Sequence, residues 1–329
     1  MEERKKDHIS LALQAQLPTS HNDSRFYYEP MLAAHPVGMS SPTQLLGKEL
    51  AIPFWVSSMT GGTSAARTIN QNLARVCGEF GMGMGLGSCR ILLDSPKHYN
   101  DFDVRDLLGS HLPFYANIGI CQLEDLLDGN EVDRLTEIVK RLRTDGLIVH
   151  VNPLQEWFQA EGDRIKRPPI ETITQLLEVV DYPIIVKEVG QGMGYQSLSA
   201  LLKLPIAAVE LAAFGGTNFS KMEMLRANTP EAEAFSGLAA VGHSAIEMVE
   251  MVNDIVLNEP IRCNQLIISG GVENFLDGYY LLSKSSLPAV VGMASAFLKY
   301  AQDYELLKRF VVAQVKGFRM AQSFLRVKE

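Results

Sequence analysis

The sequence predicts a (β/α)₈ barrel, because eight short apolar segments alternate with stretches of helical periodicity along 329 residues. Near-continuous apolar strands that alternate with helices indicate a parallel sheet covered on both faces. Eight such units in a chain of this length are typical of one barrel with extensions. The expected strands are Ile52–Met59, Met82–Gly87, Pro113–Ile118, Leu147–Val151, Pro183–Val189, Ala207–Ala213, Gln265–Ser269 and Ala289–Met293.

Helical patterns follow the strands, as in Ala66–Phe80 and Glu131–Arg143. A doubly wound open sheet is the competing fold, and its dinucleotide fingerprint needs glycines directly after a strand, opening a helix. The nearest candidate, Gly81–Gly87, has the pattern of a strand interior. We therefore expect its glycines to relieve crowding inside a barrel.

Two segments fall outside the repeat. Residues 1–50 are expected to form an N-terminal extension that caps the barrel, and residues 51–329 to form the barrel itself. The interval from Gly215 to Asn264 is long for a connection between the sixth and seventh strands, and such insertions are commonly lids or binding elements.

Composition narrows the function classes. A net charge of −8 argues against a general nucleic-acid or anionic-membrane binder, although it permits an anionic small ligand. The four cysteines are widely separated, which favours reduced thiols. The charged N-terminus precedes no signal-peptide core, and no apolar run approaches the ~20 residues of a membrane span. We expect a cytoplasmic protein.

Polar residues gather where the fourth strand ends. His150 and Asn152 are two positions apart and therefore share one face, and Pro153 then stops the strand. Gln155 and Glu156 follow on the emerging segment. This set predicts a mouth for a metal-bound or phosphorylated ligand. A lone carboxylate such as Glu156 is typical of Mg²⁺ held together with substrate phosphates, with a capping role as the alternative.

Glycine turns follow the last three strands. Gly270-Gly271 and Gly292-Met293 lie after strands seven and eight, where barrels often bind a phosphate through backbone N–H groups. One Gly-Gly pair alone is typical of a tight turn. Together with Gly215-Gly216-Thr217, the two turns favour a phosphate site.

Two cations also stand at strand ends. Lys187 lies in a strand buried on both faces, so it needs an anionic partner or a depressed pKa. Glu188 points to the opposite face, which favours an electron-rich ligand edge as the partner of Lys187. Arg90 can meet an anion bidentately or pair with Asp94 or Glu79. By itself, the run at Arg4-Lys5-Lys6 is typical of a solvated tail.

In these motifs the chain resembles the FMN-dependent type 2 isopentenyl-diphosphate isomerases, from Arg4 to about Leu298. Any one motif is weak, and their order along the chain carries the resemblance. The motifs are Arg-Lys-x-x-His at Arg4 to His8, Met-Thr-Gly-Gly at Met59 to Gly62, Ile-Asn-x-x-Leu-Ala at Ile69 to Ala74, Gly-Ser-x-Arg at Gly87 to Arg90, Asn-Ile-Gly at Asn117 to Gly119, His-x-Asn-x-x-Gln-Glu at His150 to Glu156, Val-Lys-Glu-Val-Gly at Val186 to Gly190 and Gly-Gly-Thr at Gly215 to Thr217.

The resemblance implies a barrel enzyme that interconverts isopentenyl and dimethylallyl diphosphates with reduced FMN and Mg²⁺, and with NAD(P)H as the flavin reductant. It also implies a homo-oligomer, and a tail at Arg4 and Lys5 that folds over the mouth. The implied FMN residues are Ser58, Met59, Thr60, Ser88, Asn117, Lys187 and Thr217, with Gly270, Gly271, Gly292 and Met293 at its phosphate. The implied diphosphate residues are Arg4, Lys5, Ser88, Arg90, His150, Asn152 and Gln155, with Glu156 on Mg²⁺.

The chain departs from the family pattern at a few positions. Cys89 stands where glutamine is usual, Ala212 replaces a serine, and Asn218-Phe219 stands where Ser-Trp is common. Two alternatives remain open: an FMN-dependent oxidoreductase on the same barrel, and a non-catalytic barrel that binds flavin or an isoprenoid diphosphate. No carboxylate dyad suited to both proton transfers is found at the strand ends, so the resemblance assigns that chemistry to reduced FMN.

Overall fold

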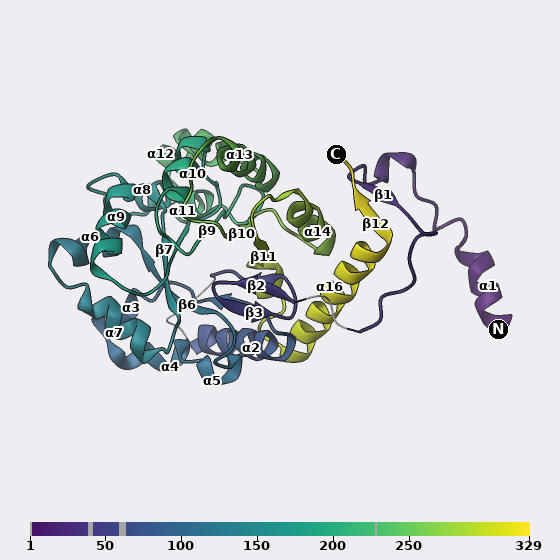
Figure 1. Cartoon of the computed structure of the whole chain (residues 1–329), viewed down its shortest axis with the longest axis horizontal. Coiled ribbons are helices and arrows are strands. Elements are labelled where there is room, and N and C mark those ends of the chain that lie inside the picture. Colours follow the sequence, from purple (N-terminus) through teal and green to yellow (C-terminus); the bar gives the residue numbers. More distant parts are fainter. Residues whose placement is uncertain (1, 39–41, 59–63, 228) are drawn as a thin grey trace.

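Eight parallel strands close into a barrel at the centre of this computed structural model, which describes residues 2–38, 42–58, 64–227 and 229–329 (Figure 1). Each strand pairs with its neighbours in chain order, and the last pairs with the first, so the predicted (β/α)₈ barrel is confirmed. The strands are β4 (Phe54–Val56), β5 (Gly83–Gly85), β6 (Phe114–Gly119), β7 (Gly146–His150), β8 (Ile184–Lys187), β9 (Ala208–Glu210), β10 (Leu266–Ser269) and β11 (Ala289–Met293).

Glycines in β5 make room for large side chains in the barrel. A Cβ atom on Gly83 would lie 2.5 Å from the Trp55 ring, and one on Gly85 would lie 2.6 Å from Ile148 Cδ1. Trp55 and Ile148 are fully buried. The expectation that the Gly81–Gly87 run relieves crowding is confirmed, because any larger residue would displace the packed core.

Helices surround the strands (Figure 1). Most bury one apolar face against the barrel, as does the helix that directly follows β4, which buries Leu73, Val76 and Cys77. The helices after the strands are α2 (Ser64–Phe80), α3 (Ile91–Asp94), α4 (Tyr99–Phe102), α5 (Arg105–Leu108), α6 (Ile120–Asp128), α7 (Asp133–Arg141), α8 (Pro153–Phe158), α9 (Pro169–Val179), α10 (Tyr195–Leu202), α11 (Phe219–Ala227), α12 (Pro230–Ala234), α13 (Ala245–Asn258), α14 (Phe275–Lys284), α15 (Ser295–Leu298) and α16 (Tyr304–Phe324).

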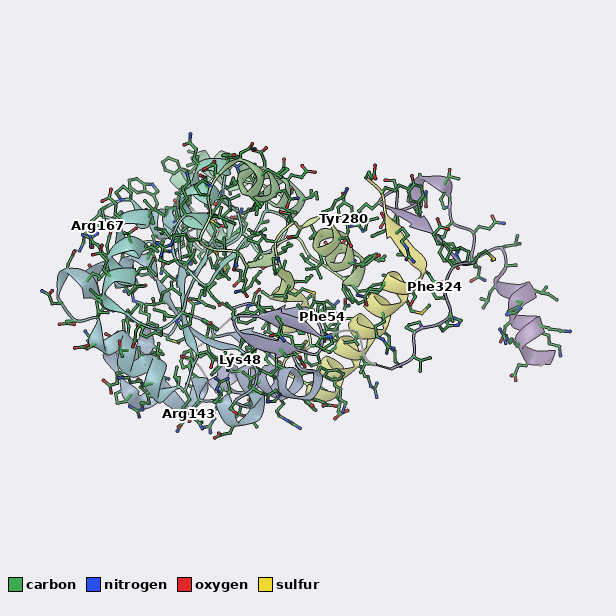
Figure 2. All side chains as sticks on the ribbon, in the orientation of Figure 1. Lys48, Phe54, Arg143, Arg167, Tyr280 and Phe324 are labelled. Carbon is green, nitrogen blue, oxygen red and sulfur yellow. The ribbon has the colours of Figure 1, made fainter. Side chains whose placement is uncertain are left out.

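A hairpin of β2 (Thr43–Leu45) and β3 (Lys48–Leu50) covers the amino-terminal end of the barrel. Lys48, labelled in Figure 2, places Nζ 2.6 Å from Asp145 Oδ1, directly before β7. The Leu46 N–H donates to the Gln265 side chain directly before β10. With this end closed by the hairpin, the opposite end, where the strands finish, is left for a site.

The rest of the N-terminal extension lies beside the C-terminal helix. β1 (Phe26–Tyr28) pairs antiparallel with β12 (Leu325–Val327), and Phe26 stacks on Tyr279 of α14. Before it, α1 (Glu2–Leu11) projects away from the barrel beyond α16 (Figure 1). Across the described ranges no helix combines the length and apolar character needed to span a membrane.

Candidate functional site

A cavity of about 530 Å³ opens at the carboxyl ends of β4, β8, β9, β10 and β11. It is the place where the glycine turns, the buried lysine and several strand-end hydroxyls meet. Of the residues that the resemblance assigns to FMN, those that line this cavity are Ser58, Lys187, Thr217, Gly270, Gly271, Gly292 and Met293.

The glycine turns pack backbone against backbone. Gly270 has a φ of 89°, and a Cβ atom there would lie 2.1 Å from the Ala213 carbonyl oxygen. Gly215 has a φ of 114°, and a Cβ atom there would lie 3.0 Å from the Gly271 Cα, so the turns after β9 and β10 face each other closely. Only glycine permits this approach, and it leaves backbone groups along the cavity wall.

Lys187 ends β8 and is 7% exposed. Its Nζ donates to the Glu188 carbonyl oxygen at 2.8 Å, and burial lowers its pKa despite the nearby Glu210 and Glu188 carboxylates. The Glu188 carboxylate instead accepts the N–H groups of Gly190, Gln191 and Gly192. Of the two outcomes expected for Lys187, an anionic partner or a depressed pKa, the structure shows a lowered pKa, and Glu188 is the poor side-chain partner expected. The electron-rich ligand edge stays a prediction.

Glu210, which sequence reasoning missed, ends β9 in the same layer. Its Cα is the register partner of Lys187, and its side chain is fully buried in the lining of the same cavity. Oε1 accepts from Ser269 Oγ at 3.2 Å, while Oε2 has no hydrogen-bond partner among the described residues. Burial raises the pKa of this carboxyl, and Lys187 and the Ser57 and Ser269 hydroxyls oppose that rise.

A chain of polar contacts joins the cavity to the end of β7. Asn117 Nδ2 donates to Ser58 Oγ at 2.8 Å, and Asn117 Oδ1 lies 2.7 Å from His150 Nδ1. Because Oδ1 can only accept, Nδ1 carries the proton and the ring's Nε2 is left as an acceptor. Burial, helped by the charge of Lys187, lowers the pKa of His150 to about 3, so the ring is neutral near pH 7.

The segment after β7 forms a second polar group. Asn152 is 2% exposed, and its Nδ2 donates to Gln155 Oε1 and to Glu156 Oε1, both at 3.1 Å. Glu156 is 6% exposed, and its Oε2 accepts the Asp163 N–H at 2.9 Å. Asn152 Oδ1 has no partner in the described part of the chain. This arrangement brings together the three residues expected here, and it orients a carboxylate.

Arg90 pairs with Asp163 at 3.0 Å, so the expectation of Asp94 or Glu79 as its ion-pair partner is wrong. Asp163 lies in the loop after α8, far along the chain, and also accepts from Gln122 Nε2. Arg90 remains half exposed, and Ser88 beside it is exposed. The β5 and β7 loops therefore meet through Arg90 and Asp163.

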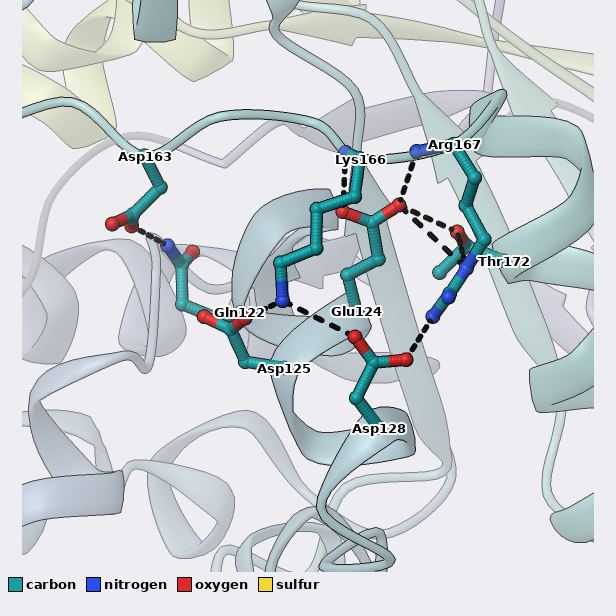
Figure 3. Close-up of polar contacts among 8 residues, drawn as sticks. All are labelled: Gln122, Glu124, Asp125, Asp128, Asp163, Lys166, Arg167 and Thr172. Atoms are coloured by element: carbon teal, nitrogen blue, oxygen red, sulfur yellow. Dashed lines mark hydrogen bonds and ion pairs between the residues drawn. The ribbon is translucent and has the colours of Figure 1, made fainter.

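The loop that carries Asp163 is fastened to α6 (Figure 3). The fully buried Glu124 carboxylate accepts the backbone N–H groups of Lys166 and Arg167 and the Thr172 hydroxyl. Lys166 and Arg167 also pair with Asp128. Hydrogen bonds and ion pairs thus hold both the backbone and the side chains of this loop on α6, and the loop in turn positions Asp163 beside Glu156.

Some predicted residues are not brought to the mouth in this chain. Arg4 and Lys5 lie exposed on α1, away from the barrel (Figure 1), and Met59 and Thr60 lie outside the described residues. Of the departures, Cys89 is buried, and burial raises its pKa to about 12. Ala212 is half-buried, has a φ of 44°, and its N–H donates to Ser269 Oγ at 3.0 Å.

Metal ligands of the dense all-protein kind are not found. No group of three or more His, Cys, Asp or Glu side chains suited to a metal occurs in residues 2–38, 42–58, 64–227 and 229–329. The cavity has one further cation that sequence reasoning missed, the exposed Lys299 after β11. Only its position seven residues after Gly292, directly after α15, could have signalled a phosphate contact.

Two curated proteins similar to this chain carry the same name. The chain is 33% identical over 310 residues to an isopentenyl-diphosphate delta-isomerase from Rickettsia peacockii (strain Rustic), covering 93% of this chain and 87% of that protein. It is 34% identical over 327 residues to an isopentenyl-diphosphate delta-isomerase from Synechococcus sp., covering 97% and 91%. No protein-family model matches.

Solved structures show the same fold at low identity. The flavin-binding domain of baker's yeast flavocytochrome b2 has a TM-score of 0.59 and 14% identity, covering 91% of this chain and 72% of that chain. A mandelate oxidase variant with an FMN adduct has a TM-score of 0.52 and 12% identity, covering 92% and 88%. Both support the barrel described above.

Proposed function

The chain belongs to the isopentenyl-diphosphate delta-isomerase family. From this premise we propose which residues at the barrel mouth bind the cofactor and which bind the substrate. The enzyme interconverts isopentenyl diphosphate and dimethylallyl diphosphate. The observation that carries the proposal is the pairing of two polar regions at one barrel end: the cavity over β8–β11, and the cluster after β7. A double-bond shift adds one proton and removes another, with no net redox change.

We infer that the cavity takes FMN. The fit rests on two buried polar atoms, Ser57 Oγ and Glu210 Oε2, for which the described residues supply no hydrogen bond of good geometry and to which a ligand can offer one. The glycine turns at Gly270-Gly271 and Gly292 supply backbone groups for a phosphate, and Lys187 supplies a cation. Reduced flavin, when bound, supplies acid–base chemistry that the side chains at the strand ends lack.

The FMN residues of this proposal combine residues of the cavity lining and Asn117 with residues that only the resemblance assigns. Asn117 fixes Ser58 on one side and His150 on the other, so its amide sets the orientation of both. The proposed contacts are Ser58, Met59, Thr60, Ser88, Asn117, Lys187 and Thr217, with Gly270, Gly271, Gly292 and Met293 at the phosphate.

The substrate diphosphate and Mg²⁺ are assigned to the cluster after β7. Glu156 is held by Asn152 Nδ2 and the Asp163 N–H, which leaves lone pairs of its two oxygens for a metal. One carboxylate with substrate phosphates and waters is a common Mg²⁺ environment. We assign Asn152, Gln155, His150, Ser88 and Arg90 to the diphosphate that this metal would bind, and the neutral His150 Nε2 can accept a hydrogen bond from a phosphate hydroxyl.

Arg4 and Lys5 complete the diphosphate site only if α1 reaches a mouth. In the single chain α1 lies beyond α16, and its neighbours along the arm include exposed Ile9, Leu13 and Leu17. We propose that a second copy of the chain covers these apolar residues and receives Arg4 and Lys5 at its mouth. The homo-oligomer expected from the resemblance would then be part of the substrate site.

Two finer proposals concern the setting of the enzyme. NAD(P)H serves as the reductant of the flavin, which the resemblance supports. All four cysteines are free and buried, which supports a reducing compartment such as the cytoplasm.

The test is anaerobic turnover. Purified protein, FMN, Mg²⁺ and dithionite are incubated with isopentenyl diphosphate, and dimethylallyl diphosphate is followed by NMR. We expect product only when both FMN and Mg²⁺ are present. Absence of product, with flavin bound and reduced in the protein's absorption spectrum, would refute the proposed function.

A further inference from the structure

Glu210 and Lys187 are opposite charges on neighbouring strands that do not pair with each other. They end β9 and β8 in register, so both side chains point into the barrel mouth. Lys187 Nζ donates to the Glu188 carbonyl oxygen, and no ion pair between Lys187 and Glu210 is formed within 4.0 Å in the described structure. Each side chain keeps hydrogen-bonding capacity toward the cavity that both line.

The hydrogen bonds around Glu210 identify which of its two carboxylate oxygens is free for a ligand. Ser269 Oγ accepts the Ala212 N–H at 3.0 Å, so its own proton is available for Glu210 Oε1 at 3.2 Å. Oε2 is then an acceptor with no partner among the described residues, on a side chain with no solvent exposure. A buried carboxylate without full hydrogen bonding is costly, so this oxygen calls for a ligand group that donates.

The position of Glu210 around the barrel selects that group. Lys187 stands at the end of β8, Glu210 at the end of β9, and the glycine turns follow β10 and β11. If the phosphate of FMN lies at the glycine turns and its ring edge lies at Lys187, the chain between them passes the end of β9. In FMN that chain is a ribityl group, which carries hydroxyl donors.

We propose that the Glu210 carboxylate accepts a hydrogen bond from a ribityl hydroxyl of FMN, and so orients the flavin in the cavity. This inference rests on the proposed FMN site. Glu210 is a cofactor-binding residue in this account, and Ser57, whose buried hydroxyl lowers the Glu210 pKa, lines the same cavity.

The experiment pairs a protein change with a ligand change. Apoprotein is titrated by flavin fluorescence with FMN and with an FMN analogue whose ribityl chain is replaced by an unhydroxylated phosphopentyl chain. We expect Glu210→Gln to raise the Kd for FMN about 10- to 100-fold, the size of one charge-assisted hydrogen bond. The Kd for the analogue should change less than about threefold. Glu250→Gln, the same change on the exposed face of α13, is the control.

The outcomes separate this inference from the proposed function. Suppose that wild-type protein binds FMN, and that Glu210→Gln either weakens the binding of FMN and of the analogue equally or weakens the binding of neither. The ribityl contact is then wrong, while the FMN site stands. If wild-type protein binds neither ligand, both fail. Circular dichroism reports whether each variant is folded. Glu210→Asp, which keeps the charge on a shorter side chain, should also weaken FMN more than the analogue.

Discussion

Glu156→Gln separates the metal role of this carboxylate from its structural role. The two oxygens of Glu156 each accept from a fixed donor, Asn152 Nδ2 at 3.1 Å and the Asp163 N–H at 2.9 Å. A glutamine must turn its NH₂ group toward one of these donors, so one buried hydrogen bond is lost. Leaving a buried donor unsatisfied costs about 1–3 kcal/mol. In a domain of this size, that cost lowers the melting temperature by roughly 2–6 °C.

The effect on catalysis should be larger and specific to the metal. Glutamine removes the only carboxylate of the cluster after β7, so Mg²⁺ loses its one charged protein ligand. We expect the Mg²⁺ concentration that gives half-maximal turnover to rise at least about tenfold, one charge-assisted contact or more. FMN absorbance of the protein should be unchanged, because the cavity over β8–β11 lies apart from Glu156.

Initial rates of isomerisation across a Mg²⁺ series measure this effect, with thermal unfolding followed in parallel. Glu161→Gln is the matched control, since Glu161 lies in the loop directly after α8, is two-thirds exposed and pairs with Arg226 at 3.4 Å. Half-maximal turnover at the wild-type Mg²⁺ concentration in Glu156→Gln would show that Glu156 does not hold the metal.

Three further changes test the geometry. Gly270→Ala places a Cβ atom 2.1 Å from the Ala213 carbonyl oxygen. FMN binding, measured by fluorescence, should be lost, and the free energy of unfolding should fall by more than about 2 kcal/mol. Gly237→Ala, where a Cβ atom meets open space, should change neither. Arg90→Ala should raise the KM for isopentenyl diphosphate about tenfold. The free energy of unfolding should change by less than about 1 kcal/mol, because the ion pair between Arg90 and Asp163 is half exposed. An unchanged KM would show that Arg90 is not part of the diphosphate site. The pKa of His150 is lowered from 6.5 to about 3, so unfolding takes up a proton and stability falls as pH drops from about 6.5 toward 3. Chemical denaturation of His150→Gln should show a slope shallower by at most about 1.4 kcal/mol per pH unit, and parallel slopes would contradict the shift.

Apolar periodicity carries most of the information on the fold. Each of the eight expected strands overlaps one barrel strand, and Ala289–Met293 matches β11 at both ends, while β6 and β7 each extend one residue beyond the expected range, at Gly119 and Gly146. The expected strands overran the observed ones elsewhere, because apolar residues continue into the buried strand ends and turns, as at Ile52 and Ala213. Apolar character reports burial, and strand limits depend on pairing with distant segments.

The site was predictable where the chemistry is local to one strand end. His150, Asn152 and Glu156 lie within one short segment, and the structure brings them together. Glu210 was missed because a single carboxylate inside an apolar strand gains meaning only from Lys187 and Ser269 on neighbouring strands. The Arg90–Asp163 pair was missed for the same reason: its partner comes from a loop positioned by Glu124 on α6.

The ratio of product to flavin tests the central claim most directly. Protein with bound, fully reduced FMN is mixed anaerobically with excess isopentenyl diphosphate and Mg²⁺, and dimethylallyl diphosphate and the flavin spectrum are measured together. An isomerase forms many product molecules for each flavin while the flavin stays reduced. Absence of dimethylallyl diphosphate, with the flavin becoming oxidised while the double bond of isopentenyl diphosphate is reduced to the saturated diphosphate, would contradict the account and favour an oxidoreductase on the same barrel.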